Sequence, residues 1–149
     1  MHDKIFVDFD DTLCLHPHGI SSSKYITSPP EYIAEHAYKD SCVNSSLVAW
    51  LHKKQTDEKA QLYLITSAST FMVAAKRIWI EKNCPELTFA DYIGVSVDTD
   101  KTSVIEAYRK IFPGDRRMYY IEDSFSERAK TEKAVEGVIV RSPQWISNS

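Results

Sequence analysis

The chain is poor in glycine, in cysteine and in long apolar runs, and each shortage narrows the class of protein. It has 4 glycines and 3 cysteines in 149 residues, and an odd, widely spaced set of cysteines does not form a disulfide framework. No apolar run approaches the roughly 18 residues that cross a bilayer. The N-terminus does not resemble a secretory signal, because Asp3 and Lys4 lead directly into a short apolar run that carries carboxylates. We therefore expect an intact cytoplasmic protein with no membrane partner.

An excess of basic residues is also missing. The chain has 18 basic and 21 acidic residues, a net charge of −3, which gives no electrostatic reason to expect nucleic acid as a partner. Its composition, 43% hydrophobic and 26% charged, is typical of globular proteins. The length fits a single domain over residues 1–149.

Short apolar runs alternate with helical patterns along most of the chain. The runs are Lys4–Phe9, Gln61–Thr66, Tyr92–Val97, Met118–Ile121 and Val138–Arg141. They are continuous, as in strands that are buried on both faces of a parallel sheet. Helices are expected over Leu47–Lys54, Thr70–Lys82, Lys101–Phe112 and from Ser124 to Gly137. This alternation predicts a Rossmann-like, doubly wound α/β fold with five parallel strands, and a frayed tail over Ser142–Ser149.

The segment from about residue 14 to residue 46 does not follow this alternation. It is polar and irregular, and the only element expected in it is a short helix from Glu31 to about Lys39, after Pro29-Pro30. A loop of this length in a compact domain is usually functional, for example as a lid over a site. We predict a flap or small cap inserted after the first strand.

Three carboxylates, Asp8, Asp10 and Asp11, follow the first strand. Clustered carboxylates repel one another, so a fold keeps them where a cation binds or where they perform chemistry. In a parallel sheet, ligands bind at the carboxyl ends of the strands. The other strands and turns bring to that edge Thr66, Ser67, Lys101, Glu122 and Asp123. Carboxylate oxygens suit Mg²⁺, and hydroxyl and ammonium groups suit phosphate, so the pattern predicts a site for a phosphorylated substrate.

In these residues the chain resembles the haloacid dehalogenase superfamily of phosphohydrolases. That family begins with an apolar run and D-x-D-x-T/V-L/V, then has a strand ending in Thr or Ser, a Lys, and a strand ending in paired acids. The matching residues, in the same order and spanning nearly the whole chain, are Asp8, Asp10, Thr12, Leu13, Thr66, Lys101, Glu122 and Asp123.

The resemblance implies a Mg²⁺-dependent phosphatase that acts on phosphomonoesters. Asp8 would attack phosphorus and form an aspartyl-phosphate, and Asp10 would act as the acid and base. The phosphoryl oxygens would bind Thr66, Lys101 and, in our interpretation, Ser67. Mg²⁺ would be held by the Asp8 carboxylate, the Asp10 carbonyl and Asp123, with Glu122 as a direct or neighbouring ligand. An acid at the position of Asp10 resembles phosphatases and phosphomutases rather than dehalogenases.

Other residues near these motifs admit a second interpretation. Lys76 competes with Lys101 for the phosphate-binding role, but its place on an amphipathic helix favours a solvated side chain. Asp11 is interpreted as a loop or cap residue, because the family motif does not require it.

Two histidines in the inserted segment, His16 and His18, are candidates for substrate contact. With Cys14 and Cys42 they also suggest a zinc site, but the paired Cys-x-Cys of such loops is missing.

The substrate expected from these features is a small phosphorylated metabolite, such as a nucleotide or a sugar phosphate. The insertion is too short for a second domain, which needs about 50 residues. The site would thus be open to a bulky substrate or covered by a neighbouring subunit of a homo-oligomer. A polynucleotide-end phosphatase, which an open site suits but the net charge does not, and a non-catalytic binding protein are the alternatives. A phosphomutase is less favoured because it needs a closed cap to exclude water.

Overall fold

A parallel sheet forms the centre of the structure, which is a computed structural model describing residues 2–16, 25, 27–96, 98–112 and 116–147. The sheet has five strands in the order β5-β4-β1-β6-β7. Their bounds are Lys4–Val7 for β1, Gln61–Ser67 for β4, Phe89–Val95 for β5, Met118–Ile121 for β6 and Val138–Arg141 for β7. The predicted fold class is confirmed. Strand β5 overlaps the predicted Tyr92–Val97 run, but it begins at Phe89 and ends at Val95, and Val97 lies outside the described residues.

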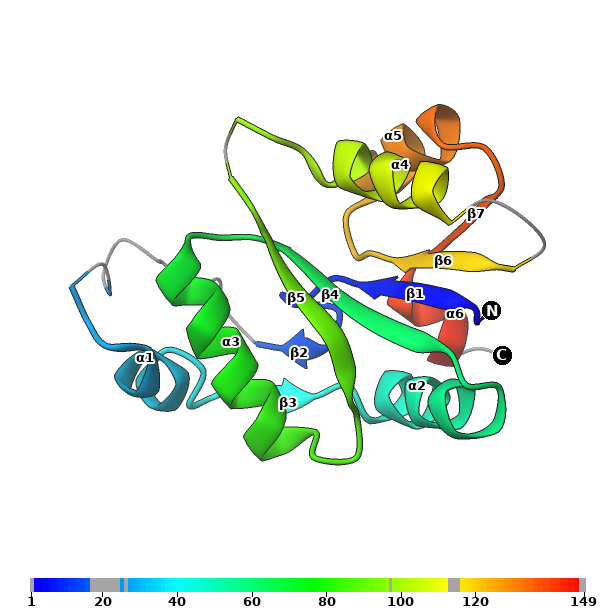
Figure 1. The fold of residues 1–149 in the computed structure, drawn as a ribbon. Coiled ribbons are helices and arrows are strands. Elements are labelled where there is room, and N and C mark those ends of the chain that lie inside the picture. The colour runs from blue at the N-terminus through cyan, green and yellow to red at the C-terminus, as the bar shows by residue number, and fades with distance from the viewer. Residues whose placement is uncertain (1, 17–24, 26, 97, 113–115, 148–149) are drawn as a thin grey trace.

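Helices cover both faces of this sheet. Figure 1 shows α4 and α5 on one side of it and α2 and α6 on the other. The helices are α2 (Ser45–Asp57), α3 (Thr70–Asn83), α4 (Lys101–Ile111), α5 (Phe125–Ala134) and α6 (Pro143–Ser147). Ile5 and Val7 of β1 pack in the core under α2 and α3, whereas Phe6 packs in the core under α4. Successive strand residues point to opposite faces, so two covered faces explain why the runs are continuously apolar.

The strand register brings the carboxyl ends of the central strands together. Val7, the last residue of β1, pairs with Leu64 of β4 and with Ile121 of β6. The backbone N–H of Asp8 donates to the Ile121 carbonyl at 3.0 Å. The polar residues that follow these three strands therefore share one edge of the sheet.

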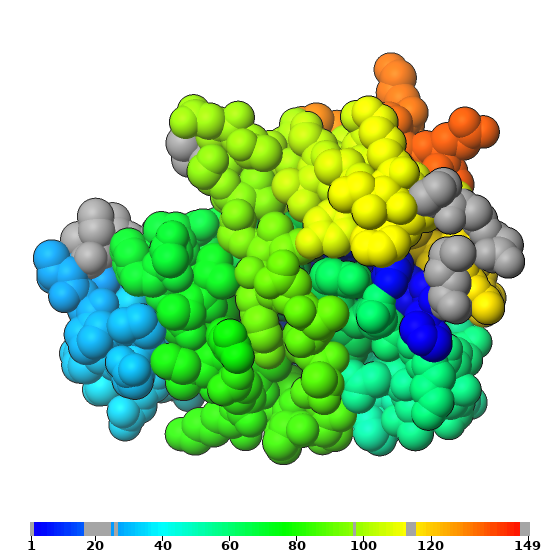
Figure 2. Space-filling view, viewed as in Figure 1, coloured from blue at the N-terminus to red at the C-terminus, as the bar shows by residue number. Residues whose placement is uncertain are grey.

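The inserted segment contains more regular structure than the sequence predicts. Its helix, α1 (Pro30–His36), confirms the expected short helix, but β2 (Cys14–Leu15) and β3 (Cys42–Val43) form an antiparallel pair that was not expected. Helix α1 packs against α3, and Figure 2 shows the two segments side by side at the surface. The role of this segment as a flap stays a prediction.

The prediction of a frayed tail over Ser142–Ser149 is wrong for residues 142–147, and residues 148–149 lie outside the described part of the chain. Helix α6 docks through Ile146, which is buried, and through Trp145, whose ring lies edge-on to Trp50 of α2 with centroids 6.2 Å apart. The sequence did not reveal this because the partners of the tail lie far away along the chain.

None of the described helices combines the length and the apolar character needed to cross a membrane.

Helix α3 approaches β5 closely at Gly94, which pairs with Thr66 of β4. A Cβ atom added at Gly94 would lie 2.6 Å from Cγ2 of Val73 and 3.2 Å from the Ala68 carbonyl oxygen. A side chain here would push α3 and the loop after β4 away from the sheet.

We expect Gly94→Ala to lower the free energy of unfolding by about 1–3 kcal/mol, as overpacking does elsewhere. Urea denaturation measures this change. Val73→Ala removes the clashing methyl group, so the double variant should lose less stability than the sum of the single variants. Additive losses would contradict the proposed contact.

Candidate active site

Asp8 is buried at the end of β1, and each of its carboxylate oxygens has a partner. The Thr12 hydroxyl donates to Oδ2 at 2.9 Å, and Lys101 Nζ donates to Oδ1 at 2.8 Å. The same Nζ also donates to Oε2 of Glu122 at 3.1 Å. Three residues that sequence reasoning assigned to one site thus form one buried cluster of two carboxylates and one ammonium group.

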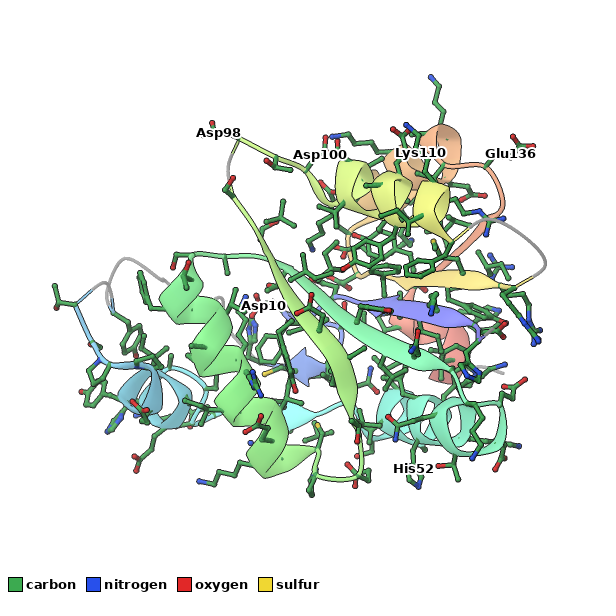
Figure 3. All side chains as sticks on the ribbon, in the orientation of Figure 1. Asp10, His52, Asp98, Asp100, Lys110 and Glu136 are labelled. Carbon is green, nitrogen blue, oxygen red and sulfur yellow. The ribbon has the colours of Figure 1, made fainter. Side chains whose placement is uncertain are left out.

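Local structure fixes the position of Lys101. Asp100 caps α4 because its Oδ1 accepts the Ser103 N–H at 2.7 Å, which makes Lys101 the first residue of the helix. Hydrogen bonds from Lys130 and Ser103 lower the pKa of Asp100 to about 2. Figure 3 shows Asp100 at the start of α4. Asp100 is therefore the N-cap residue of α4.

Two further hydrogen bonds hold Glu122. Its Oε2 accepts the Tyr120 hydroxyl at 2.9 Å, and its Oε1 accepts the Ser124 N–H at 3.4 Å. Asp123, the second acid of the pair, is exposed. The two neighbouring acids therefore differ: Glu122 faces the cluster from a buried position, while Asp123 is open to solvent.

The cluster carries more negative than positive charge. Burial raises the pKa of Asp8, and Lys101 opposes that shift. Burial and then the charge of Asp8 raise the pKa of Glu122 to about 7, again against Lys101. Burial lowers the pKa of Lys101, but its two carboxylate partners outweigh burial and raise it overall. One ammonium group between two buried carboxylates leaves an anionic excess that a bound cation would relieve.

The oxygen atoms at this edge are of the chemical type that Mg²⁺ binds. This ion prefers hard oxygen ligands and uses only one or two carboxylates, keeping water or phosphate for the rest. Within the described ranges, no group of three or more His, Cys, Asp or Glu side chains is arranged to hold a metal ion. The anionic excess at Asp8 and Glu122 supplies the charge that such an ion needs. The assignment of Asp8, Asp10, Glu122 and Asp123 as metal ligands remains a prediction.

A second cluster surrounds Asp10. The Lys76 ammonium group lies 2.9 Å from Oδ2 of Asp10, and His16 Nε2 lies 3.3 Å from Oδ1. Lys76 also donates to the Thr66 hydroxyl at 2.6 Å. Lys76 therefore joins Asp10 to Thr66, and His16 contacts Asp10 directly.

The prediction of a solvated Lys76 is wrong, because its side chain is only 3% exposed. Its neighbours on the buried face of α3 include Met72 and Ile80, which are four residues away on either side. Residues at this spacing lie on the same helix face. The position of Lys76 within the apolar stripe was the clue in the sequence.

Other predicted residues lie around a cavity of about 270 Å³ beside Asp10. Ser67 is exposed and lines this cavity together with His16. His18 lies outside the described residues. Asp11 is exposed, has a positive φ of 60°, and its N–H donates to the Cys14 carbonyl at 2.8 Å. This turn geometry agrees with the interpretation of Asp11 as a loop residue.

The raised pKa of Glu122 predicts how stability depends on pH. Its pKa is about 7 in the folded chain against an ordinary 4.5, so the folded state binds this proton more tightly than the unfolded state. The contribution of Glu122 to stability therefore falls as the pH rises through this window. Without added Mg²⁺, the free energy of unfolding of Glu122→Gln should therefore rise relative to that of the wild type as the pH increases. We expect this gain to be roughly 1–3 kcal/mol between about pH 5 and pH 8.

Urea denaturation at several pH values measures that difference. Added Mg²⁺ should reduce it, because a bound cation stabilises the ionised carboxylate of the wild type. A difference that does not change with pH would contradict the charge imbalance.

Comparisons with known proteins agree with this fold. No protein-family model and no curated protein sequence matches the chain. Among solved structures, the chain is similar to the crystal structure of an archaeal beta-phosphoglucomutase from the hyperthermophilic Pyrococcus sp. strain ST 04. The match has a TM-score of 0.53 and 16% sequence identity, and covers 94% of this chain and 85% of that chain. The identity limits this likeness to the fold, which is a Rossmann-like α/β fold with a five-stranded parallel sheet.

Proposed function

We propose that this chain is a Mg²⁺-dependent phosphatase that hydrolyses small phosphomonoesters through an aspartyl-phosphate on Asp8. The observation that carries the proposal is the buried Asp8 carboxylate, held by Thr12 on one oxygen and Lys101 on the other at the end of β1. Similarity in fold to a phosphoglucomutase supports a phosphoryl-transfer function.

In the first step an oxygen of Asp8 attacks phosphorus, and the bond between phosphorus and the leaving oxygen breaks. The Asp10 carboxyl group gives its proton to that oxygen, so an alcohol leaves. Lys101 touches the attacking carboxylate, and its charge offsets the negative charge of the transferring group. Electrostatic stabilisation of this kind usually gives the largest contribution to phosphoryl transfer.

In the second step Asp10, now ionised, removes a proton from water. The resulting hydroxide attacks the phosphorus of the aspartyl-phosphate, inorganic phosphate leaves, and the Asp8 carboxylate is restored. One residue can serve as the acid and then as the base because its protonation state alternates between the two steps.

Thr66 is suited to hold a phosphoryl oxygen. Its hydroxyl accepts a hydrogen bond from Lys76, and an ammonium group can only donate. The Thr66 hydroxyl proton is therefore free to be donated to a phosphoryl oxygen. Ser67, exposed at the next position, would add a second hydroxyl.

The residues that would hold Mg²⁺ are Asp8, Asp10 through its carbonyl, Asp123 and Glu122. When bound, the ion supplies positive charge that polarises the phosphoryl group as a Lewis acid. The buried carboxylates of Asp8 and Glu122, with one ammonium group between them, are what make a divalent cation fit here.

We expect Asp8→Asn to lower Mg²⁺-dependent release of inorganic phosphate by on the order of 10³-fold or more, as the loss of a nucleophile does. An amide cannot attack phosphorus, yet it keeps the shape of the side chain. Turnover of p-nitrophenyl phosphate and thermal unfolding are the measurements. Asp11→Asn is the matched control: it removes a neighbouring carboxylate and should retain full turnover.

Full activity of Asp8→Asn would exclude the mechanism. A panel of nucleotides, sugar phosphates and a 3′-phosphorylated oligonucleotide identifies the substrate class. If the wild type with Mg²⁺ turned over none of them, the fold would serve binding instead of catalysis.

A further inference from the structure

The Lys76 ammonium group is buried where an apolar side chain would fill the space. Its neighbours on the same face of α3 are apolar, and it lies 5.3 Å from the centre of the Phe9 ring. A buried ammonium group costs several kcal/mol unless it is paired and hydrogen-bonded. Its ammonium group donates hydrogen bonds to Oδ2 of Asp10 and to the Thr66 hydroxyl, the two groups assigned above to proton transfer and phosphoryl binding.

Asp10 is held from both sides. Lys76 binds its Oδ2, and His16 lies within 3.3 Å of its Oδ1. The Asp10 side chain is 41% exposed, whereas that of Lys76 is 3% exposed. Lys76 is therefore buried more deeply than the carboxylate, and its ammonium group can orient that carboxylate through the contact with Oδ2. Two contacts on separate oxygens restrict a carboxylate that would otherwise sample several rotamers.

Two cavities are both lined by the loop Ser67–Ser69, but Asp10 lines only one of them. The cavity of about 270 Å³ is lined by Asp10 and Lys76. The other, of about 590 Å³, includes Lys101 but not Asp10 in its lining. A general acid must come within about 2.6–3.2 Å of the oxygen that it protonates. The leaving alcohol therefore belongs in the first cavity.

The lining of that cavity indicates the kind of alcohol. Besides Asp10 it contains the hydroxyl groups of Ser67 and Ser69, the Lys76 ammonium group, and the side chains of Met72, Tyr38 and His16. Its volume is below the range of about 300–1,000 Å³ that holds drug-sized ligands. Such a cavity suits a small hydroxylated aliphatic alcohol, whose poorly stabilised alkoxide makes a positioned acid important.

We propose that Lys76 is a positioning residue that aligns the Asp10 carboxyl group with the leaving oxygen of a small aliphatic phosphomonoester. Its contact with Thr66 fixes the Asp10 carboxyl group relative to the residue that would bind the phosphoryl group. This inference deepens the proposed function and depends on it. The role differs from that of Lys101, which touches the nucleophile Asp8.

The test compares kcat/KM for two substrates that differ in their need for a proton. Glycerol 3-phosphate releases a poorly acidic alcohol, whereas p-nitrophenyl phosphate releases a phenolate that needs little protonation. We expect Lys76→Met to lower kcat/KM by about 10²-fold for glycerol 3-phosphate and by less than about 5-fold for p-nitrophenyl phosphate. Lys82→Met, an exposed lysine on the same helix, is the control and should change neither value.

A double variant tests whether Lys76 acts through Asp10. In the Asp10→Asn background, Lys76→Met should cause no further loss with glycerol 3-phosphate. Equal losses for both substrates, or a full further loss in that background, would overturn the proposal. If Lys76→Met does not fold, Lys76→Arg decides: it should show the same substrate dependence with a smaller loss, and a uniform loss would overturn the proposal.

Turnover by the wild type distinguishes failure of the role proposed for Lys76 from failure of the proposed phosphatase function. Mg²⁺-dependent turnover by the wild type, with uniform losses in the variants, would overturn only the role of Lys76. If the wild type hydrolysed neither substrate nor any member of the panel above, both would be overturned.

Discussion

The site depends on the ion pairs that the buried ammonium group of Lys101 forms with the carboxylates of Asp8 and Glu122. Strand pairing places both carboxylates at the same sheet edge, where burial removes much of the water that would otherwise screen them. Asp100 fixes the start of α4, and so delivers the cation to this point. Without that cation the centre of the fold would hold two unpaired anions. With it, the cluster still lacks one positive charge.

A second ion pair, between Lys76 and Asp10, lies beside the first. Lys76 reaches Asp10 from α3, while Lys101 reaches Asp8 from α4. Two of the three carboxylates that follow β1, Asp8 and Asp10, are therefore paired with different cations on different helices. Under the proposed mechanism, one pair serves attack on phosphorus and the other serves proton transfer. Because the two ion pairs share no residue, a substitution of Lys76 leaves the pair between Lys101 and Asp8 intact.

Local patterns predicted much of the fold. The runs around β1, β4 and β6 have residues buried on both faces, and those of β7 pack against the core on both faces, so their apolar character is visible without knowing their partners. The pair β2–β3 escaped notice because strands of two residues carry too little pattern, and their stability comes from pairing with each other. The docking of α6 escaped notice because Trp145 packs on Trp50, a residue that nothing in the local sequence connects to the tail.

The sequence by itself determined the order of the elements and the residues at the carboxyl ends of the strands, because periodicity and strand-terminal polar residues are local properties. It identified Asp8, Asp10, Thr66, Lys101 and the pair Glu122-Asp123 as members of one edge. Tertiary structure decided which acid of that pair is buried, and that Lys76 points inward to Asp10 and Thr66. An amphipathic pattern gives the face of a helix, but only packing decides what a long side chain on that face can reach.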